Sequence, residues 1–180
     1  MYALKLRKEL YQVSRFYVYN ASRERVGLLQ NLDSVQWLEN YQAAGEVKIC
    51  ARLTVDNLAM LVEGNRVFNT DSDTVARITH VDLDSANSQE IITARADLTA
   101  ELLSDRVVMA TESVKNVESG MYSIYSKNRR NLPIEISTVS GYTEITDTEI
   151  TWSSVLDGET NLAKVSGLGF KVVFDPESAV

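Results

Sequence analysis

Residues 34–49 read SVQWLENYQAAGEVKI. Apolar and polar side chains alternate along the first half, the alternation stops at residues 42–45, and it resumes after Gly45. A period of two is typical of a β-strand that buries one face. The stretch therefore predicts two antiparallel strands joined by a turn, with Trp37 and Tyr41 on the first strand. No residue in it points to catalysis, so we interpret the pair as an element of packing and assembly.

The faces of these two strands follow from the alternation. On the first strand, Trp37 shares a face with Val35 and Glu39, and Leu38 lies on the opposite face. The second strand is predicted to be half-buried and antiparallel. Its apolar face is formed by Val47, Ile49, Ala51 and Leu53.

The remainder of the first half also reads as strands. We predict them at residues 16–19, 26–29, 66–69, 74–83 and 89–96, with polar hairpin loops at 20–25 and 84–88. Thr54 is predicted to cap a short helix that ends at Gly64. Its apolar face would carry Val55, Leu58, Ala59 and Val62. Asp97 is predicted to cap a helical turn that carries Leu98, Leu102 and Leu103.

The pattern changes near Met109, where helical spacing replaces the period of two. Thr111 is predicted to cap an amphipathic helix with Val114, Val117, Met121, Ile124 and Tyr125 on one face. Pro133 is predicted to open a strand at residues 134–139. Thr151 is predicted to cap a second helix that ends at Gly167, and residues 170–174 a last strand. The apolar face of that helix would be Trp152, Val155, Leu156, Leu162, Ala163 and Val165.

These patterns predict an α+β fold. Residues 1–108 form a mainly antiparallel, barrel-like or sandwich domain, and residues 109–180 form a smaller region of helices and strands. The chain stops shortly after the last predicted strand. We therefore expect a segment of a longer protein, incomplete at its C-terminus.

Composition excludes several classes of protein. The net charge of −7 over 180 residues argues against broad nucleic-acid binding, which needs a basic face. A single cysteine, Cys50, excludes an internal disulfide and thiolate metal clusters, and a single histidine, His80, excludes multi-histidine metal sites. No apolar run is long enough for a transmembrane helix, and the N-terminus lacks a signal peptide's apolar core. We expect synthesis in the cytoplasm and no cofactor.

Candidate chemistry is sparse. Cys50 and His80 are residue types that can form a nucleophile and its base, but a structural role for each is the favoured interpretation because Cys50 lies on the polar face of a regular strand. The acidic pairs at residues 71–73 and 82–84 lack the glycine and final glutamate of a calcium loop, so they are interpreted as turns. Residues 167–169 (GLG) lack the third glycine of a dinucleotide-binding motif and precede a predicted strand. They are therefore interpreted as the end of a helix.

Two further groups of side chains are candidates, one of carboxylates for acid–base chemistry and one of aromatic residues for binding. Glu144, Asp147 and Glu149 lie between threonines and are interpreted as a solvated turn. A set of aromatic residues could line a sugar-binding groove, but packing is favoured. This set is Phe16, Tyr17, Tyr19, Trp37 and Tyr41. No pair of carboxylates stands out as acid and base, so the sequence predicts no enzyme and no catalytic, cofactor or metal residue.

The order of these elements resembles the N-terminal part of the baseplate hub, or tail-associated, proteins of long-tailed phages and prophages. The residues that carry the resemblance are Val35–Trp37 with Gly45–Val47, Leu61–Arg66, Ala76–Val81, and Asp97–Leu98 with Leu102–Val108. It covers residues 30–110 closely and extends more loosely to about residue 175.

The resemblance implies a structural protein of the virion tail tip, made in the host cytoplasm. Similar hub proteins are homotrimers whose barrel domains form a ring that continues the tail tube and anchors distal tail parts. The implied partners are copies of itself and the distal tail and tape-measure proteins, with neither a membrane nor sequence-specific nucleic acid. Leu38 is the first candidate for an interface residue. Some members precede peptidoglycan-degrading or receptor-binding modules.

The sequence is compatible with two alternative functions. One is a cell-wall-acting tail module, either a peptidoglycan hydrolase or a carbohydrate-binding module, which would need paired carboxylates in a cleft or an exposed aromatic platform. The other is a β-rich binding domain that acts alone in the cytoplasm.

Overall fold

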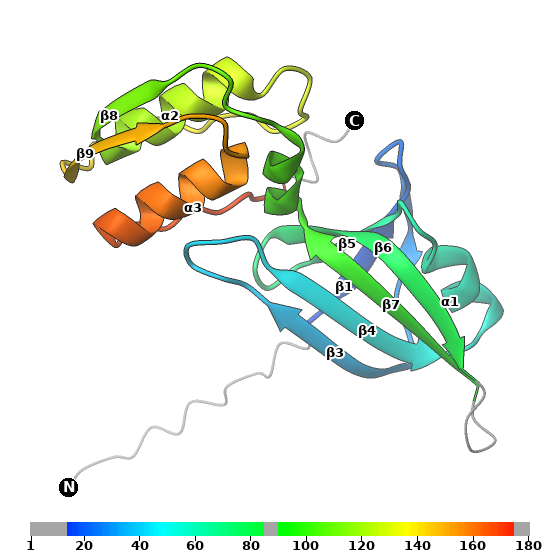
Figure 1. Ribbon diagram of the computed structural model, residues 1–180. Helices are drawn as coiled ribbons and strands as arrows, with labels where there is room; N and C mark the ends of the chain where they lie inside the picture. The colour runs from blue at the N-terminus through cyan, green and yellow to red at the C-terminus, as the bar shows by residue number, and fades with distance from the viewer. Residues whose placement is uncertain (1–13, 85–89, 175–180) are drawn as a thin grey trace, which may run out of the picture.

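The computed structural model describes residues 14–84 and 90–174. Figure 1 shows two lobes: a curled β-sheet, and a smaller group of helices with a two-stranded ribbon. We call residues 14–98 the sheet lobe and residues 106–167 the helical lobe. The 3-10 helix η2 (Thr99–Asp105) connects them. Each lobe has its own cluster of buried apolar side chains.

The sheet lobe is built from antiparallel strands in the order β2-β1-β5-β6-β7-β4-β3. Trp37 of β3 packs against Phe16 of β1 with 5.7 Å between ring centroids, so the curled sheet folds its far strands over one core. β2 and β3 form the two ends of the sheet and do not pair with each other, so the sheet is sandwich-like. The predicted α+β class is confirmed. The strands are β1 (Phe16–Tyr19), β2 (Arg25–Leu28), β3 (Leu32–Leu38), β4 (Glu46–Arg52), β5 (Arg66–Asn69), β6 (Thr74–Asp84) and β7 (Ile91–Leu98).

The stretch at residues 34–49 forms most of β3 and the beginning of β4. Trp37 lies opposite Val47 in the register, and Val47, Ile49 and Ala51 are buried as predicted. The first strand is shorter than predicted, because β3 ends at Leu38 and Tyr41 lies in the connecting loop, 70% exposed.

Gly45 is buried at the start of β4, where the chain passes close to the end of β3. A Cβ atom at this position would overlap the carbonyl oxygen of Leu38 and lie 2.7 Å from Leu98 Cδ1. The glycine is therefore required by the close approach of two backbones.

The helix α1 (Val55–Met60) begins where predicted, since Thr54 Oγ1 accepts a hydrogen bond from the Asn57 amide at 3.1 Å. Its predicted apolar face is wrong. The residues Val55, Leu58, Ala59 and Val62 are exposed, whereas Asn57, Met60 and Leu61 are buried. Asn57 Nδ2 donates to the carbonyl oxygens of Gln30 and Arg52, each at 2.9 Å, and these bonds turn the polar side of the helix inward.

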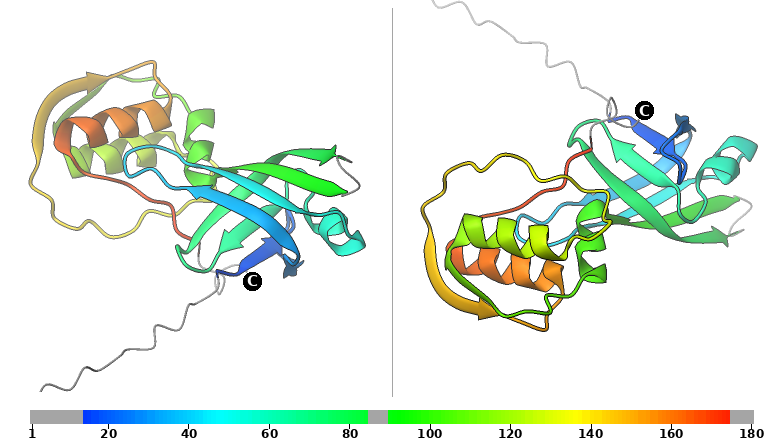
Figure 2. Two further views of the ribbon diagram at one scale, coloured as in Figure 1. Left: turned by 90° about the horizontal axis from the view of Figure 1, so that it is seen from below. Right: turned by 90° about the horizontal axis from the view of Figure 1, so that it is seen from above.

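The helical lobe packs a two-stranded ribbon and two helices around one core (Figure 2). Its elements are β8 (Glu112–Asn116), α2 (Val117–Asn128), β9 (Ile145–Ile150) and α3 (Val155–Ser166). The buried residues Val117, Ile124, Val155 and Leu162 are fully enclosed. Leu103 of η2 and Val108 belong to the same core, so residues before 109 already pack with this lobe.

The helix starts of this lobe differ from the predicted ones. Asn116, not Thr111, caps α2, and Val114 lies on β8. Ser154, not Thr151, caps α3 by accepting a hydrogen bond from the Asp157 amide at 2.9 Å. Asp97 is part of β7, and η2 has no side-chain cap. The predicted end of α3 is confirmed, because Gly167 adopts the left-handed conformation with a φ of 75°.

Two predicted strands of the second half are absent from the described residues, and two strands, β8 and β9, were not predicted. Residues 134–139 form no strand, and two of their carbonyl groups bond to side chains: the hydroxyls of Tyr125 and Tyr122 donate to Ile134 O at 2.6 Å and to Thr138 O at 2.9 Å. Residues 170–174 also form no strand. The acidic segment interpreted as a turn is β9, which pairs with β8.

The loop predicted at residues 84–88 lies outside the described residues beyond Asp84. Within residues 14–84 and 90–174, none of the helices has the length and apolar character needed to cross a membrane.

Candidate functional site

One cavity lies where residues 39–45 face the segment 168–174, which we call the return segment. Its volume is about 400 Å³. The return segment leaves α3 and runs back to the sheet lobe, where Phe174 packs against the rings of Tyr19 and Phe68 at centroid distances of 5.2 and 5.3 Å. Gln42 Nε2 donates to Leu168 O at 3.1 Å, so the loop and the segment form the walls of the cavity together.

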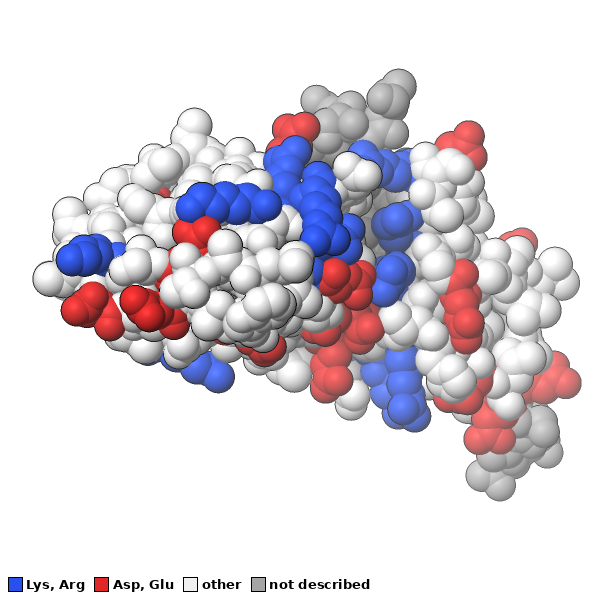
Figure 3. Space-filling view, turned by 45° about the horizontal axis from the view of Figure 1, so that its top comes forward, with Lys and Arg blue, Asp and Glu red and all other residues white. Residues whose placement is uncertain are grey.

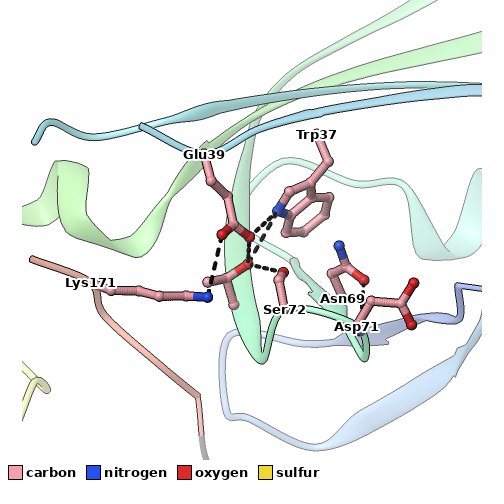
Figure 4. Close-up of polar contacts among 7 residues, drawn as sticks. Trp37, Glu39, Asn69, Asp71, Ser72 and Lys171 are labelled. Atoms are coloured by element: carbon pink, nitrogen blue, oxygen red, sulfur yellow. Dashed lines mark hydrogen bonds and ion pairs between the residues drawn. The ribbon is translucent and has the colours of Figure 1, made fainter. Parts of the chain in front are cut away.

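Glu39 is the polar centre of this junction (Figure 4). Its Oε1 accepts hydrogen bonds from Trp37 Nε1 at 3.1 Å and from Thr74 Oγ1 at 2.8 Å. Its Oε2 lies 3.3 Å from Lys171 Nζ of the return segment. Burial alone would raise the pKa of Glu39, but the Ser72 and Thr74 hydroxyls and the Lys171 ammonium lower it below its ordinary value. The carboxylate therefore joins β3, β6 and the return segment.

This arrangement predicts that removing the Glu39 carboxylate lowers the free energy of unfolding more than removing the Lys171 ammonium does. Glu39→Ala is expected to destabilise the fold by about 1–2 kcal/mol, because two hydrogen bonds to a charged acceptor are lost. Lys171→Met should cost less than about 1 kcal/mol, because the ion pair is partly solvent-exposed. Urea unfolding followed by tryptophan fluorescence measures both, with exposed Glu46→Ala as the control. Equal losses for the two variants would contradict this account.

A second cavity, of about 280 Å³, lies in the helical lobe between α2, α3 and residues 134–142. We call it the helical-lobe cavity. Two buried carboxyl groups, Glu118 of α2 and Glu159 of α3, are among its lining residues. Its walls also include Leu103, Met121, Tyr125, Ile134, Ile136 and Phe170.

The two carboxyl groups have different surroundings. Glu118 accepts hydrogen bonds from the backbone amides of Ser140, Gly141 and Tyr142, so both of its oxygens hold that loop. Glu159 is 5% exposed, and its Oε1 has no hydrogen-bond partner among the described residues. Burial raises the pKa of Glu159 to about 8, which leaves the group mostly neutral at pH 7.

The molecular surface mixes charges of both signs. Figure 3 shows Lys and Arg side chains gathered where the two lobes meet, with acidic side chains among them. On the sheet, Lys48 lies opposite Arg95, but Glu46 lies opposite Asp97 one pleat away. This face therefore does not form the continuous basic track that nucleic acid requires.

The residues considered from sequence do not assemble into a reactive site. Cys50 contacts Thr93 Oγ1 at 3.6 Å, whereas His80 pairs with Asp82 at 2.9 Å and Glu63 at 3.7 Å. Among the described residues, no group of three or more His, Cys, Asp or Glu side chains is placed to hold a metal ion.

The aromatic and acidic candidates are dispersed in the same way. Phe16 and Tyr19 belong to buried clusters, and Tyr17 carries the Arg25 guanidinium over its ring at 3.9 Å. Ser14 donates a hydrogen bond to Asp71 in the turn before β6. Sequence reasoning missed Glu39, Glu118 and Glu159. A signal existed for Glu159, because it lies between Val155 and Leu162 on the apolar stripe of a helix.

Two solved structures with a similar fold are tail proteins. The prophage tail protein gp18 from Listeria monocytogenes EGD-e matches with a TM-score of 0.61 and 15% identity, over 90% of this chain and 48% of that one. The tail protein from Neisseria meningitidis MC58 matches with a TM-score of 0.57 and 10% identity, over 87% and 46%. At these identities the likeness establishes the fold alone. The chain spans about half the length of each of these proteins.

Family membership follows from the sequence itself. The chain belongs to the family described as Siphovirus ReqiPepy6 Gp37-like protein, whose model matches residues 15–180. The comparison with curated proteins finds no match. Together with the fold, the family confirms the resemblance to tail-associated proteins of long-tailed phages.

Proposed function

We propose that this chain is a structural component of the tail tip of a long-tailed phage or prophage, a baseplate hub protein. In this role it forms a ring that continues the tail tube, and it anchors distal tail parts for host attachment and DNA delivery. One observation carries the proposal: a chain of a siphovirus family folds over 90% of its length like a prophage tail protein. Its partners are copies of itself and the distal tail and tape-measure proteins.

The ring is proposed to form through the sheet lobe, within the domain of residues 1–108, with residues 109–180 as the smaller region. β2 and β3 are end strands, and among the described residues neither pairs with another strand along its outer edge, so each could meet another surface. Leu38 on β3 is 51% exposed, and a head-to-tail contact between copies closes a ring when the rotation fits. The net charge of −7 suits a channel that DNA passes without binding.

Oligomeric state tests this proposal. We expect light scattering at tens of micromolar to give a homotrimer for the intact protein, and Leu38→Glu to weaken it because a charge enters an apolar contact. Leu58→Glu is the control, because Leu58 is 47% exposed on α1, which is not part of the sheet. A strictly monomeric intact protein would count against the hub function.

The alternative is a cell-wall-acting module, either hydrolytic or carbohydrate-binding. One observation favours the hydrolytic form: Glu118 and Glu159 line the same cavity, and glycosidases use paired carboxyl groups. Against it, both oxygens of Glu118 are occupied by backbone amides. An acid–base pair needs two groups that can exchange protons with the substrate.

We therefore expect the purified chain not to clear peptidoglycan. Turbidity of a cell-wall suspension measures this, with a known muramidase as the positive control. Clearing that Glu159→Gln or Glu118→Gln abolishes would establish the alternative.

A further inference from the structure

The helical-lobe cavity combines apolar walls with one buried carboxyl group. Six side chains from η2, α2 and the two neighbouring segments form most of its apolar lining, and the cavity opens to solvent. Glu159 contributes from α3, where its neighbours on the helix face, Val155 and Leu162, are fully buried. Pockets of this composition bind small groups whose polar end meets one placed partner.

Packing alone does not explain the choice of glutamate at position 159. A buried polar atom without a hydrogen bond costs folding free energy, and Oε1 of Glu159 is such an atom among the described residues. Leucine or methionine would fill a similar volume on this apolar stripe without that cost. A ligand that enters the cavity could supply the hydrogen-bond partner that this buried carboxyl group lacks among the described residues.

The cavity lining also contains charged and titratable groups that bond to partners other than Glu159 or lie at the rim. Glu118 is held by three backbone amides, and the Tyr125 hydroxyl donates to Ile134 O. Glu135 is exposed at the rim. Lys171 is the one cation among the lining residues, and its ammonium pairs with Glu39 on the other side of the return segment.

We propose that the helical-lobe cavity binds an aliphatic primary ammonium group, with the ammonium on Glu159 and the alkyl stem along the apolar wall. A lysine side chain presented by a protein and a small alkylamine share this chemistry. An ammonium suits the site better than a guanidinium, because it has three donors to satisfy instead of five and can approach a single carboxylate end-on. The cavity volume of about 280 Å³ accommodates such a chain. The inference is independent of the proposed tail-tip function.

Binding should be coupled to proton release. Burial raises the pKa of Glu159 to about 8, so the free site holds a neutral carboxyl group at pH 7. An ammonium ion favours the carboxylate, so its binding displaces that proton. Affinity should therefore rise between pH 6 and pH 9, a range in which an alkylammonium stays charged.

Titration calorimetry with n-pentylamine tests the proposal on the whole chain. Experiments at pH 7 in two buffers of different ionisation enthalpy give the number of protons released, which should approach one. Glu159→Gln keeps the shape of the side chain and should weaken binding by about tenfold or more. Glu135→Gln is the matched control, because it makes the same substitution at the exposed rim and should change affinity less than about twofold.

A second ligand, Nα-acetyl-lysinamide, distinguishes the source of the ammonium. If it binds like pentylamine, the proposal holds and a protein lysine fits the site. If only pentylamine binds, the proposal holds for small amines. No binding of either ligand, binding without proton release, or equal binding by the Glu159→Gln variant would each overturn it. Because that variant is expected to be more stable than the natural chain, misfolding cannot produce the loss.

Discussion

Replacing Glu159 by glutamine is expected to stabilise the chain by about 3 kcal/mol at pH 7. Burial raises the pKa of this carboxyl group from 4.5 to about 8. The unfolded chain therefore releases a proton at pH 7 that the folded chain retains. The stability of the natural chain is fully present below pH 4.5 and falls as the pH rises through about 8. Glutamine has no proton to lose, so the variant avoids this fall.

Urea unfolding of both chains at pH 5 and pH 8 measures the effect. The two free energies of unfolding should differ by less than about 1 kcal/mol at pH 5, where the folded Glu159 is neutral, and should separate further as the pH rises. Glu135→Gln serves as the control, because this exposed residue lines the same cavity. Parallel stability curves for the natural chain and the Glu159→Gln variant would show that the carboxyl group is not buried as described.

Gly45→Ala should be the most damaging small substitution in the sheet lobe, with an expected loss of about 2–4 kcal/mol. The added Cβ would overlap the carbonyl oxygen of Leu38, which is backbone and cannot rotate away. It would also press on Leu98, so the pairing of β3 with β4 and the start of η2 would shift together.

Gly64→Ala separates this steric effect from the loss of glycine's conformational freedom. Gly64 has a φ of 89° and open space around the position of a Cβ atom, so its replacement should cost about 1 kcal/mol through backbone strain alone. Thermal unfolding monitored by circular dichroism compares the two variants. A Gly45→Ala variant as stable as Gly64→Ala would mean that the two strands can separate without loss.

Strand prediction worked where one face was apolar without interruption. Residues 47, 49 and 51 alternate with polar residues, and β4 pairs with a strand on each side. The face that is apolar in the sequence is therefore the face that is buried in the fold. The same rule missed β9, because in ITDTEI the apolar residues stand at the ends and threonines fill the inner face. The rule also predicted a strand at residues 134–139 that does not form. Apolar and polar residues alternate at its start, but the carbonyl groups of Ile134 and Thr138 bond to tyrosine hydroxyls.

The candidate sites could not be read from the sequence for a different reason. Glu39 and Lys171 are 132 residues apart and meet because the return segment crosses back to the sheet lobe. The inward face of α1 depends on two backbone carbonyls, of Gln30 and Arg52, that Asn57 reaches from another element. Period and propensity describe local structure, and neither identifies partners so distant in the chain.

The return segment also has a mechanical consequence. Over the part of the chain that the structure describes, the backbone passes between the lobes twice, once through η2 and once through residues 168–174. Phe174, the last described residue, donates its amide to Asp73 O at 2.8 Å. A single connection would allow one lobe to rotate relative to the other. With two, a force applied to one lobe is shared between both crossings, and bending requires Phe174 to leave Tyr19 and Phe68. The two lobes should therefore keep their relative orientation when a force is applied to one of them.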